Sequence, residues 1–120
     1  MRRMLLHGPR GVNLRCDVPE RRRERARGLL RRQEIASDEA MLFSHATSVH
    51  TFGMRFAILV VRLDPSFRVV DARLVAPQRF VPPMRVARHV LECHPDVGLR
   101  TGDRLEIRSV RRSRPVRSSL

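Results

Sequence analysis

The clearest pattern near the start of the chain is an alternation of apolar and polar residues in GVNLRCDV, residues 11–18. Val12, Leu14 and Cys16 alternate there with polar side chains. A period of two is typical of a strand with one buried face and one exposed face. We therefore predict a half-buried strand over residues 11–18.

A helix is predicted directly after this strand. Asp17 offers an acceptor side chain, Pro19 suits the first turn of a helix, and Glu20 adds a negative charge to that turn. The helix should run through PERRRERARGLL, residues 19–30, with its arginines facing solvent.

The most apolar stretch of the chain is MRFAILVVRLD, residues 54–64. Because its apolar residues occupy both faces of an extended chain, we predict a central strand that is covered on both sides. One face carries Phe56, Ile58 and Val60, and the other carries Ala57, Leu59, Val61 and Leu63.

Four further segments have the pattern of strands. A turn at residues 64–66 should join the central strand to the next one as a hairpin. Three prolines, Pro77, Pro82 and Pro83, bracket a loop that we expect to stay outside any sheet ladder. The predicted strands are AMLFSH (40–45), FRVVDARLVA (67–76), RHVLEC (88–93) and RLEIRS (104–109).

Together these elements predict one small α+β domain that is mostly β. About six short strands should form a curled sheet or an open β-barrel, with one N-terminal helix. We place a flexible basic arm at residues 1–10, the folded domain at 11–110 and a disordered basic tail at 111–120.

The net charge of +13 is unevenly distributed along the 120 residues. Residues 1–32 carry +8 and residues 108–120 carry +5, whereas residues 33–107 balance to zero. An excess of arginine could bind phosphates or an anionic membrane surface. The candidate side chains for this alternative are Arg2, Arg3, Arg21, Arg22, Arg23, Arg111, Arg112, Arg114 and Arg117.

The remaining composition narrows the class of protein. No run reaches the roughly 20 apolar residues that a bilayer requires, and the apolar start is too short for a signal peptide. We expect a cytoplasmic protein without a transmembrane segment. Cys16 and Cys93 are far apart in sequence and are expected to be free thiols.

The order of these segments resembles the DUF192 family, also called UPF0127, in its histidine-bearing branch. The resemblance runs from about Leu14 to Ile107 and implies a mostly β fold with one helix; it implies no established activity. It is carried by ERARGLLRR (24–32), AMLF (40–43), HTFGMRF (50–56), VVRLD (60–64), HVLE (89–92) and GD (102–103).

Two positions depart from the pattern of that family. Ala40 stands where the family usually has glycine before MLF. Residues 57–59 are Ala-Ile-Leu where the family usually continues Pro-Ile-Asp, so an acidic group is replaced by Leu59. Any acid/base chemistry that depends on that carboxylate would therefore be absent here.

The segment HTFGMRF, residues 50–56, concentrates scarce aromatic residues beside a histidine. If the segment is extended, His50, Phe52 and Met54 share one face, and Gly53 allows a close approach of a ligand. We predict a binding rim, with Arg55 or Arg32 as an anion clamp. The alternative is a kinked strand whose aromatic residues belong to the core.

A metal site and a cysteine nucleophile are weaker hypotheses. His89 and Cys93 share a face of their strand, and His45, His50 or Cys16 could join them, but no metal-ligand motif is present. His94 should point away from Cys93 and cannot act as its base. We predict no metal and no cofactor.

We favour a non-enzymatic ligand-binding, partner-binding or accessory domain that uses the rim. The alternative is a non-specific nucleic-acid or anionic-surface binder that acts through the terminal arginines. A weaker alternative is a hydrolase-like enzyme whose acid is Asp64 or Asp103.

Overall fold

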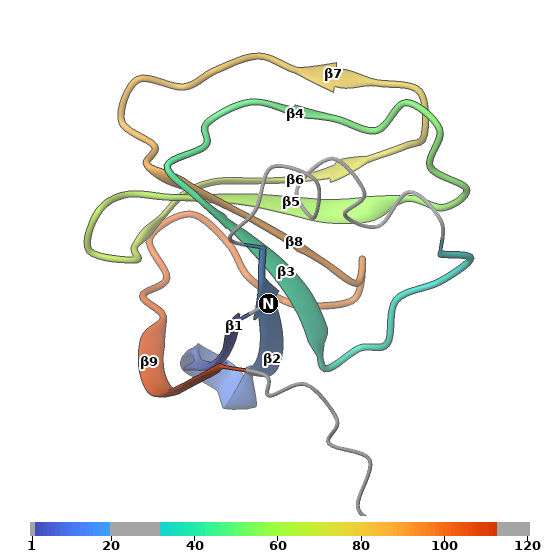
Figure 1. The fold of residues 1–120 in the computed structure, drawn as a ribbon. Helices are drawn as coiled ribbons and strands as arrows, with labels where there is room; N and C mark the ends of the chain where they lie inside the picture. The colour runs from blue at the N-terminus through green and yellow to red at the C-terminus, as the bar shows by residue number, and fades with distance from the viewer. Residues whose placement is uncertain (1, 20–31, 113–120) are drawn as a thin grey trace, which may run out of the picture.

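The computed structural model describes residues 2–19 and 32–112, and Figure 1 shows their arrangement. Apart from a 3-10 turn at Pro9–Gly11, no helix is present in these two ranges, and none there could cross a membrane. The strands are β1 (Arg2–His7), β2 (Asn13–Val18), β3 (Glu39–Ser44), β4 (Val49–His50), β5 (Ile58–Leu63), β6 (Val69–Val75), β7 (Phe80–Val81), β8 (His89–Cys93) and β9 (Glu106–Arg112).

Seven strands form one sheet in the order β6-β5-β8-β3-β2-β1-β9. Only β2 and β3 pair in parallel; the other neighbours are antiparallel. The edge strands β6 and β9 do not close the sheet into a barrel, although Arg68 and Arg104 form an isolated bridge between the segments that precede them. The prediction of one mostly β domain is confirmed, but the main sheet has seven strands rather than about six, and it is not closed into a barrel.

The central strand β5 explains how the two faces of the sheet are used. All six of its residues are buried, and alternate side chains enter two different apolar clusters. Leu59, Val61 and Leu63 belong to an inner core with residues of β1, β2, β3 and β8. The predicted central strand and the division of its faces are therefore confirmed.

We call the second cluster the outer cluster. It joins the main sheet to segments that lie outside it, because Ile35, Met54 and Val81 pack there against sheet residues. Its buried members are Ile35, Met41, Met54, Ile58, Val60, Val75, Val81 and Val90.

The predicted flexible arm at residues 1–10 is wrong, because residues 2–7 form β1. This strand lies between β2 and β9 and is hydrogen-bonded to both. Met4 and Leu6 are buried in the inner core. Its partner β9 is about a hundred residues away in the sequence, so no local pattern reveals the pairing.

The basic tail predicted from residue 111 is also wrong at its start. Strand β9 continues through Arg112 because β1 supplies a partner for its backbone. Residues 113–120, including Arg114 and Arg117, lie outside the described residues. So do residues 20–31, which contain most of the predicted helix together with Arg21, Arg22 and Arg23.

Residues 45–57 and 76–88 form what we call the outer layer, which contains the short strands β4 and β7 (Figure 1). The proline-rich loop was expected to stay outside any ladder, yet Phe80 and Val81 pair with β4. Thr51 ties the two segments together: its Oγ1 donates to the carbonyl of Ala76 at 2.7 Å and accepts from the amide of Arg79 at 2.9 Å.

A buried arginine fastens the outer layer to the sheet. Arg62 of β5 is only 3% exposed, and its guanidinium donates to Asp71 Oδ2 of β6 at 2.7 Å and 3.1 Å. It also donates to the carbonyls of Pro82 at 2.6 Å and Thr47 at 3.5 Å. Thr47 precedes β4 and Pro82 follows β7, and because the two strands are antiparallel, Arg62 holds one end of the two-stranded sheet, next to the Val49–Val81 pair.

Candidate binding surface on the outer layer

The segment that carries the predicted rim is a tight turn and not an extended strand. The Met54 amide donates to the Thr51 carbonyl at 3.1 Å, and Gly53 has a φ of 84° that favours glycine. This reversal turns Thr51 and Met54 inward, where both are buried, and leaves Phe52 outside. The prediction that Phe52 and Met54 line one face is therefore wrong.

An exposed aromatic patch forms beside this turn, from His50, Phe52 and Phe80. The rings of His50 and Phe52 stack with centroids 5.6 Å apart. His50 is paired with Phe80 across β4 and β7, and directly paired residues project from the same face of a sheet. Phe52 is 52% exposed and Phe80 is 59% exposed.

The other three phenylalanines show how unusual this exposure is within the molecule. Phe43 and Phe56 pack against the outer cluster, and Phe67 packs against the inner core. Three of the five phenylalanines are therefore partly buried against an apolar cluster, whereas Phe52 and Phe80 are exposed in the same layer. Large exposed apolar groups that gather in this way mark interaction sites.

Four exposed arginines occur in the same outer layer: Arg55, Arg79, Arg85 and Arg88. Neither segment of the layer contains an aspartate or a glutamate. Among the described residues, none of the four is within salt-bridge distance of a carboxylate, whereas Arg15, Arg32, Arg62 and Arg73 each have such a partner. The outer layer thus combines aromatic surface with positive charge that no described carboxylate neutralises.

Arg32 does not belong to this surface. Its guanidinium makes two hydrogen bonds to Glu39 at the start of β3, at 2.8 Å and 2.9 Å. These bonds outweigh burial and lower the pKa of Glu39. Arg32 is therefore engaged with a carboxylate and is not the predicted clamp. Of the five predicted rim residues, His50, Phe52 and Arg55 remain candidates.

Phe80 and Arg79 are candidates that the sequence analysis missed. They lie in APQRFVPP, between prolines, where we expected an unpaired loop. A usable signal is the aromatic residue itself, because a phenylalanine beside an arginine in a proline-bounded loop has few apolar neighbours in sequence to bury it.

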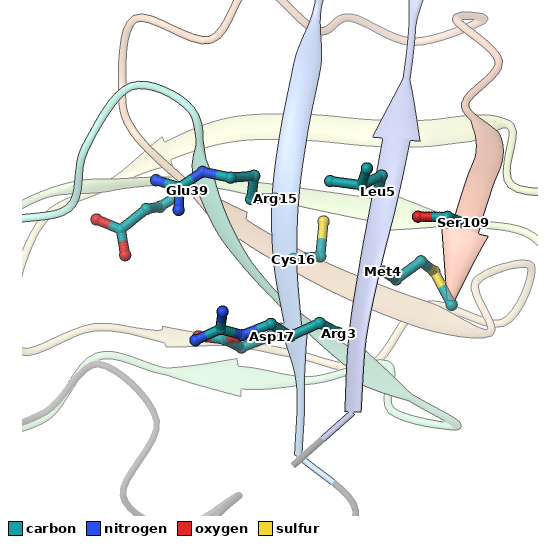
Figure 2. A pocket seen from close by; sticks show the side chains of 8 residues that line it. All are labelled: Arg3, Met4, Leu5, Arg15, Cys16, Asp17, Glu39 and Ser109. Atoms are coloured by element: carbon teal, nitrogen blue, oxygen red, sulfur yellow. The ribbon is translucent and has the colours of Figure 1, made fainter. Parts of the chain in front are cut away.

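A pocket of about 360 Å³ lies elsewhere, over β1, β2 and β3 (Figure 2). Its charged groups already have partners: Arg3 Nε is 3.2 Å from Asp17 Oδ1, and Arg15 Nε is 2.8 Å from Asp38 Oδ2. A charged ligand would have to break these pairs, which makes the pocket a weaker site than the outer layer. It is lined by Arg3, Met4, Leu5, Arg15, Cys16, Asp17, Glu39 and Ser109.

The cysteines are enclosed in the inner core. Burial raises the pKa of Cys93 to about 12 and also raises that of Cys16, so both thiols stay protonated and are poor nucleophiles. His45 and His89 do meet, with ring centroids 5.8 Å apart. No group of three histidine, cysteine or acidic side chains suited to a metal occurs within residues 2–19 and 32–112.

The two acids of the hydrolase hypothesis have structural roles. Asp64 Oδ1 accepts hydrogen bonds from the amides of Arg68 and Ser66 and from the Ser66 hydroxyl. Asp103 accepts from the Arg10 guanidinium and from the Arg100 amide. These bonds lower the pKa of both carboxyls. Both groups are therefore ionised at neutral pH, and their hydrogen bonds hold turns together.

Glu92 is a buried acid that the sequence analysis did not single out. It is 6% exposed, its Oε2 atom has no hydrogen-bond partner, and burial raises its pKa to about 7. The signal was the single acid in RHVLEC, because a period of two puts Glu92 on the same face as the buried Val90.

Fold and surface together define a small, mostly β domain whose outer layer exposes aromatic and basic side chains. The sequence matches the model of the DUF192 family, described as "Uncharacterized ACR", over residues 5–107. The chain belongs to the DUF192 family. A search of the curated proteins found no match to it.

Two solved structures share this fold. A protein of unknown function from Novosphingobium aromaticivorans DSM 12444 is 19% identical, with a TM-score of 0.71 over 87% of this chain and 83% of that one. A Sinorhizobium meliloti 1021 protein, described as a "putative transcription regulator", is 21% identical, with a TM-score of 0.73 over 88% of this chain and 92% of that one. At these identities the similarity establishes the fold alone.

Proposed function

We propose that this protein is a non-enzymatic binding domain that holds single-stranded nucleic acid on its outer layer. The observation that carries the proposal is the exposed aromatic patch in a layer that also has four exposed arginines and no acidic residue. The predicted cytoplasmic location belongs to the same proposal.

Single strands suit this surface because they present two chemical features at once. Unpaired bases offer flat faces that stack on aromatic side chains such as Phe52 and Phe80, at about 1–3 kcal/mol per base. The phosphates between the bases attract guanidinium groups, and Arg55 and Arg79 adjoin the patch in the sequence. A duplex hides its base faces and would gain only the phosphate contacts.

A protein partner is the competing occupant, since phenylalanine and arginine are also frequent in protein interfaces. Charge favours the nucleic acid. The outer layer has four arginines and no acidic residue, and the whole chain carries a net charge of +13. This excess of positive charge suits a polyanion better than an ordinary protein surface of mixed charge. The Sinorhizobium meliloti protein is described as a "putative transcription regulator", and this description accords with the proposal.

The terminal arginines are a less favoured site for the same ligand. Arg3 pairs with Asp17, and Arg10 pairs with Asp103. Guanidinium groups that are already paired with carboxylates gain less from a phosphate. The remaining terminal arginines would add non-specific attraction but no stacking, because neither arginine-rich end contains an aromatic residue.

We expect a labelled oligothymidylate of about ten nucleotides to bind, a length within the usual site sizes for single strands. Replacing both aromatic residues, as Phe52→Ser and Phe80→Ser, should lower the affinity by a factor of about 10 or more, because two bases lose their stacking surface. Fluorescence anisotropy measures this loss, and the thermal midpoint should stay nearly unchanged because both rings are exposed.

The matched control is Leu74→Ser, which removes an apolar side chain of comparable exposure from β6, outside the outer layer. It should leave the affinity unchanged. The affinity of the unaltered protein should fall with salt, with a logarithmic slope of about −2 to −3 if three or four phosphates are neutralised. Equal binding by the double variant and the unaltered protein would contradict the proposal.

A further inference from the structure

Glu92 occupies a position that an ionised carboxylate cannot comfortably hold. It lies on β8, directly between Val60 of β5 and Met41 of β3, and both neighbours belong to the outer cluster. One carboxyl oxygen, Oε2, is buried without a hydrogen-bond partner. An unpaired charge in such surroundings is costly, whereas a protonated carboxyl is tolerated far better.

Among residues 2–19 and 32–112, the charged groups nearest Glu92 are paired with other side chains or exposed to solvent. The nearest charged residues in register with Glu92 across the sheet are Arg73 of β6, which pairs with Val60, and Asp17 of β2, which pairs with Met41. Each lies two strands away from Glu92, which is roughly 10 Å. Arg73 pairs with Asp71, and Asp17 pairs with Arg3. On the same face, Arg62 of β5 is also bonded to Asp71, and Glu39 of β3 is bonded to Arg32.

The outer layer places no charged side chain in this cluster among the described residues. It contributes the apolar Met54 and Val81, and Arg55, which follows Met54 in the sequence, is exposed to solvent.

The cluster around Glu92 is also the apolar contact that attaches the outer layer to the sheet. Met54 comes from the turn beside the aromatic patch, and Val81 comes from β7. Both belong to the same apolar cluster as Met41 and Val60, the two neighbours of Glu92 on the main sheet. A change in the charge of Glu92 therefore acts on the support of the binding surface.

We propose that Glu92 is a proton-dependent latch, which keeps the outer layer attached to the sheet while it is protonated and loosens that layer when it ionises. The latch is independent of the ligand, but its effect on binding rests on the function proposed above. Loosening would leave the aromatic patch without its support on the sheet, because Phe52 and Phe80 both lie in the outer layer.

The direction of the pH dependence follows from burial, which raises the pKa of Glu92 from 4.5 to about 7. Below 4.5 the carboxyl is protonated in both the attached and the opened layer, so the latch is fully effective. Between 4.5 and 7 the opened form releases a proton that the attached form keeps. The opening equilibrium should therefore increase by up to about tenfold per pH unit in this window and level off above it.

Hydrogen exchange of the full chain, followed between pH 5 and pH 8, tests the latch. Rates are converted to protection factors, so that the intrinsic effect of pH on exchange is removed. In the unaltered protein, protection of residues 45–57 and 76–88 should fall on the order of 100-fold over this range relative to β2. In Glu92→Gln, which imitates the protonated acid, the relative protection of the outer layer should not change with pH.

The control Glu106→Gln removes a carboxyl from the exposed face of β9 and should behave like the unaltered protein. Glu92→Met serves as a second variant if Glu92→Gln does not fold. The relative protection of the outer layer in Glu92→Met should likewise not change with pH. Parallel loss of protection in β2 and in the outer layer would overturn the latch, as would an unaltered protein whose outer layer is insensitive to pH. If oligothymidylate does not bind but the exchange result holds, the latch stands and only the proposed ligand fails.

Discussion

Leu6→Asp is expected to unfold the domain, whereas Leu5→Asp, at the preceding residue, is expected to leave it folded. Leu6 is fully buried in the inner core, and Leu5 is 40% exposed on the opposite face of β1. An aspartate at residue 6 would put an unpaired charge among apolar side chains and remove a leucine from them. We expect a cost of about 4 kcal/mol or more, which is comparable with the whole stability of a small domain.

Urea denaturation of the two variants measures this difference. Leu5→Asp should keep a cooperative transition, with a loss within about 1 kcal/mol, because its side chain reaches solvent. The comparison tests whether residues 2–7 are an integral strand. Two cooperative transitions of similar midpoint would mean that this segment is a dispensable arm, and the sheet order with β1 between β2 and β9 would be wrong.

Arg62→Met is expected to have the second largest effect, a loss of about 3–5 kcal/mol in the free energy of unfolding. The variant would leave the carboxylate of Asp71 without its buried partner and the carbonyls of Thr47 and Pro82 without a donor. Burial alone would raise the pKa of Asp71, but the hydrogen bonds from Arg62 and Arg73 outweigh it and lower that pKa. Loss of Arg62 removes the stronger of these two supports, because Arg62 is the more deeply buried.

The chain offers a matched control in Arg73→Met, because Arg73 bonds the same carboxylate from a half-exposed position. Solvent screens an exposed pair, so this variant should cost no more than about 1 kcal/mol. Thermal or urea unfolding of both variants gives the comparison. Equal losses would show that the contact with Asp71 matters and that the bonds of Arg62 to the outer layer do not.

The strands that could be predicted are those whose pattern is local. In residues 11–18 and 54–64 the pattern of a strand is visible in the sequence, and the sheet contains a strand within each range, β2 at Asn13–Val18 and β5 at Ile58–Leu63. Strand β1 was missed because the apolar Leu5 lies between Met4 and Leu6 and hides their alternation. Its identity depends on β9, whose residues are remote in sequence.

The candidate surface could be predicted only in part, for a related reason. The concentration of aromatic residues in HTFGMRF pointed to the correct region, but a period of two assigned the wrong faces because Gly53 reverses the chain. Phe80 joins His50 only through the pairing of β4 with β7, which spans about thirty residues. The period of two in RHVLEC places Glu92 on the same face as Val90, but only the fold shows that this face is buried.

The measurement that tests the proposed binding surface most directly is the mapping of a bound single strand by amide chemical shifts. Oligothymidylate of about ten nucleotides is titrated into the isotopically labelled full chain at physiological salt. The proposed function predicts that the largest shifts lie in residues 50–55 and 78–81, on either side of the stacked rings. Shifts confined to β1, β9 and the arginine-rich ends, or no shifts at all, would contradict it.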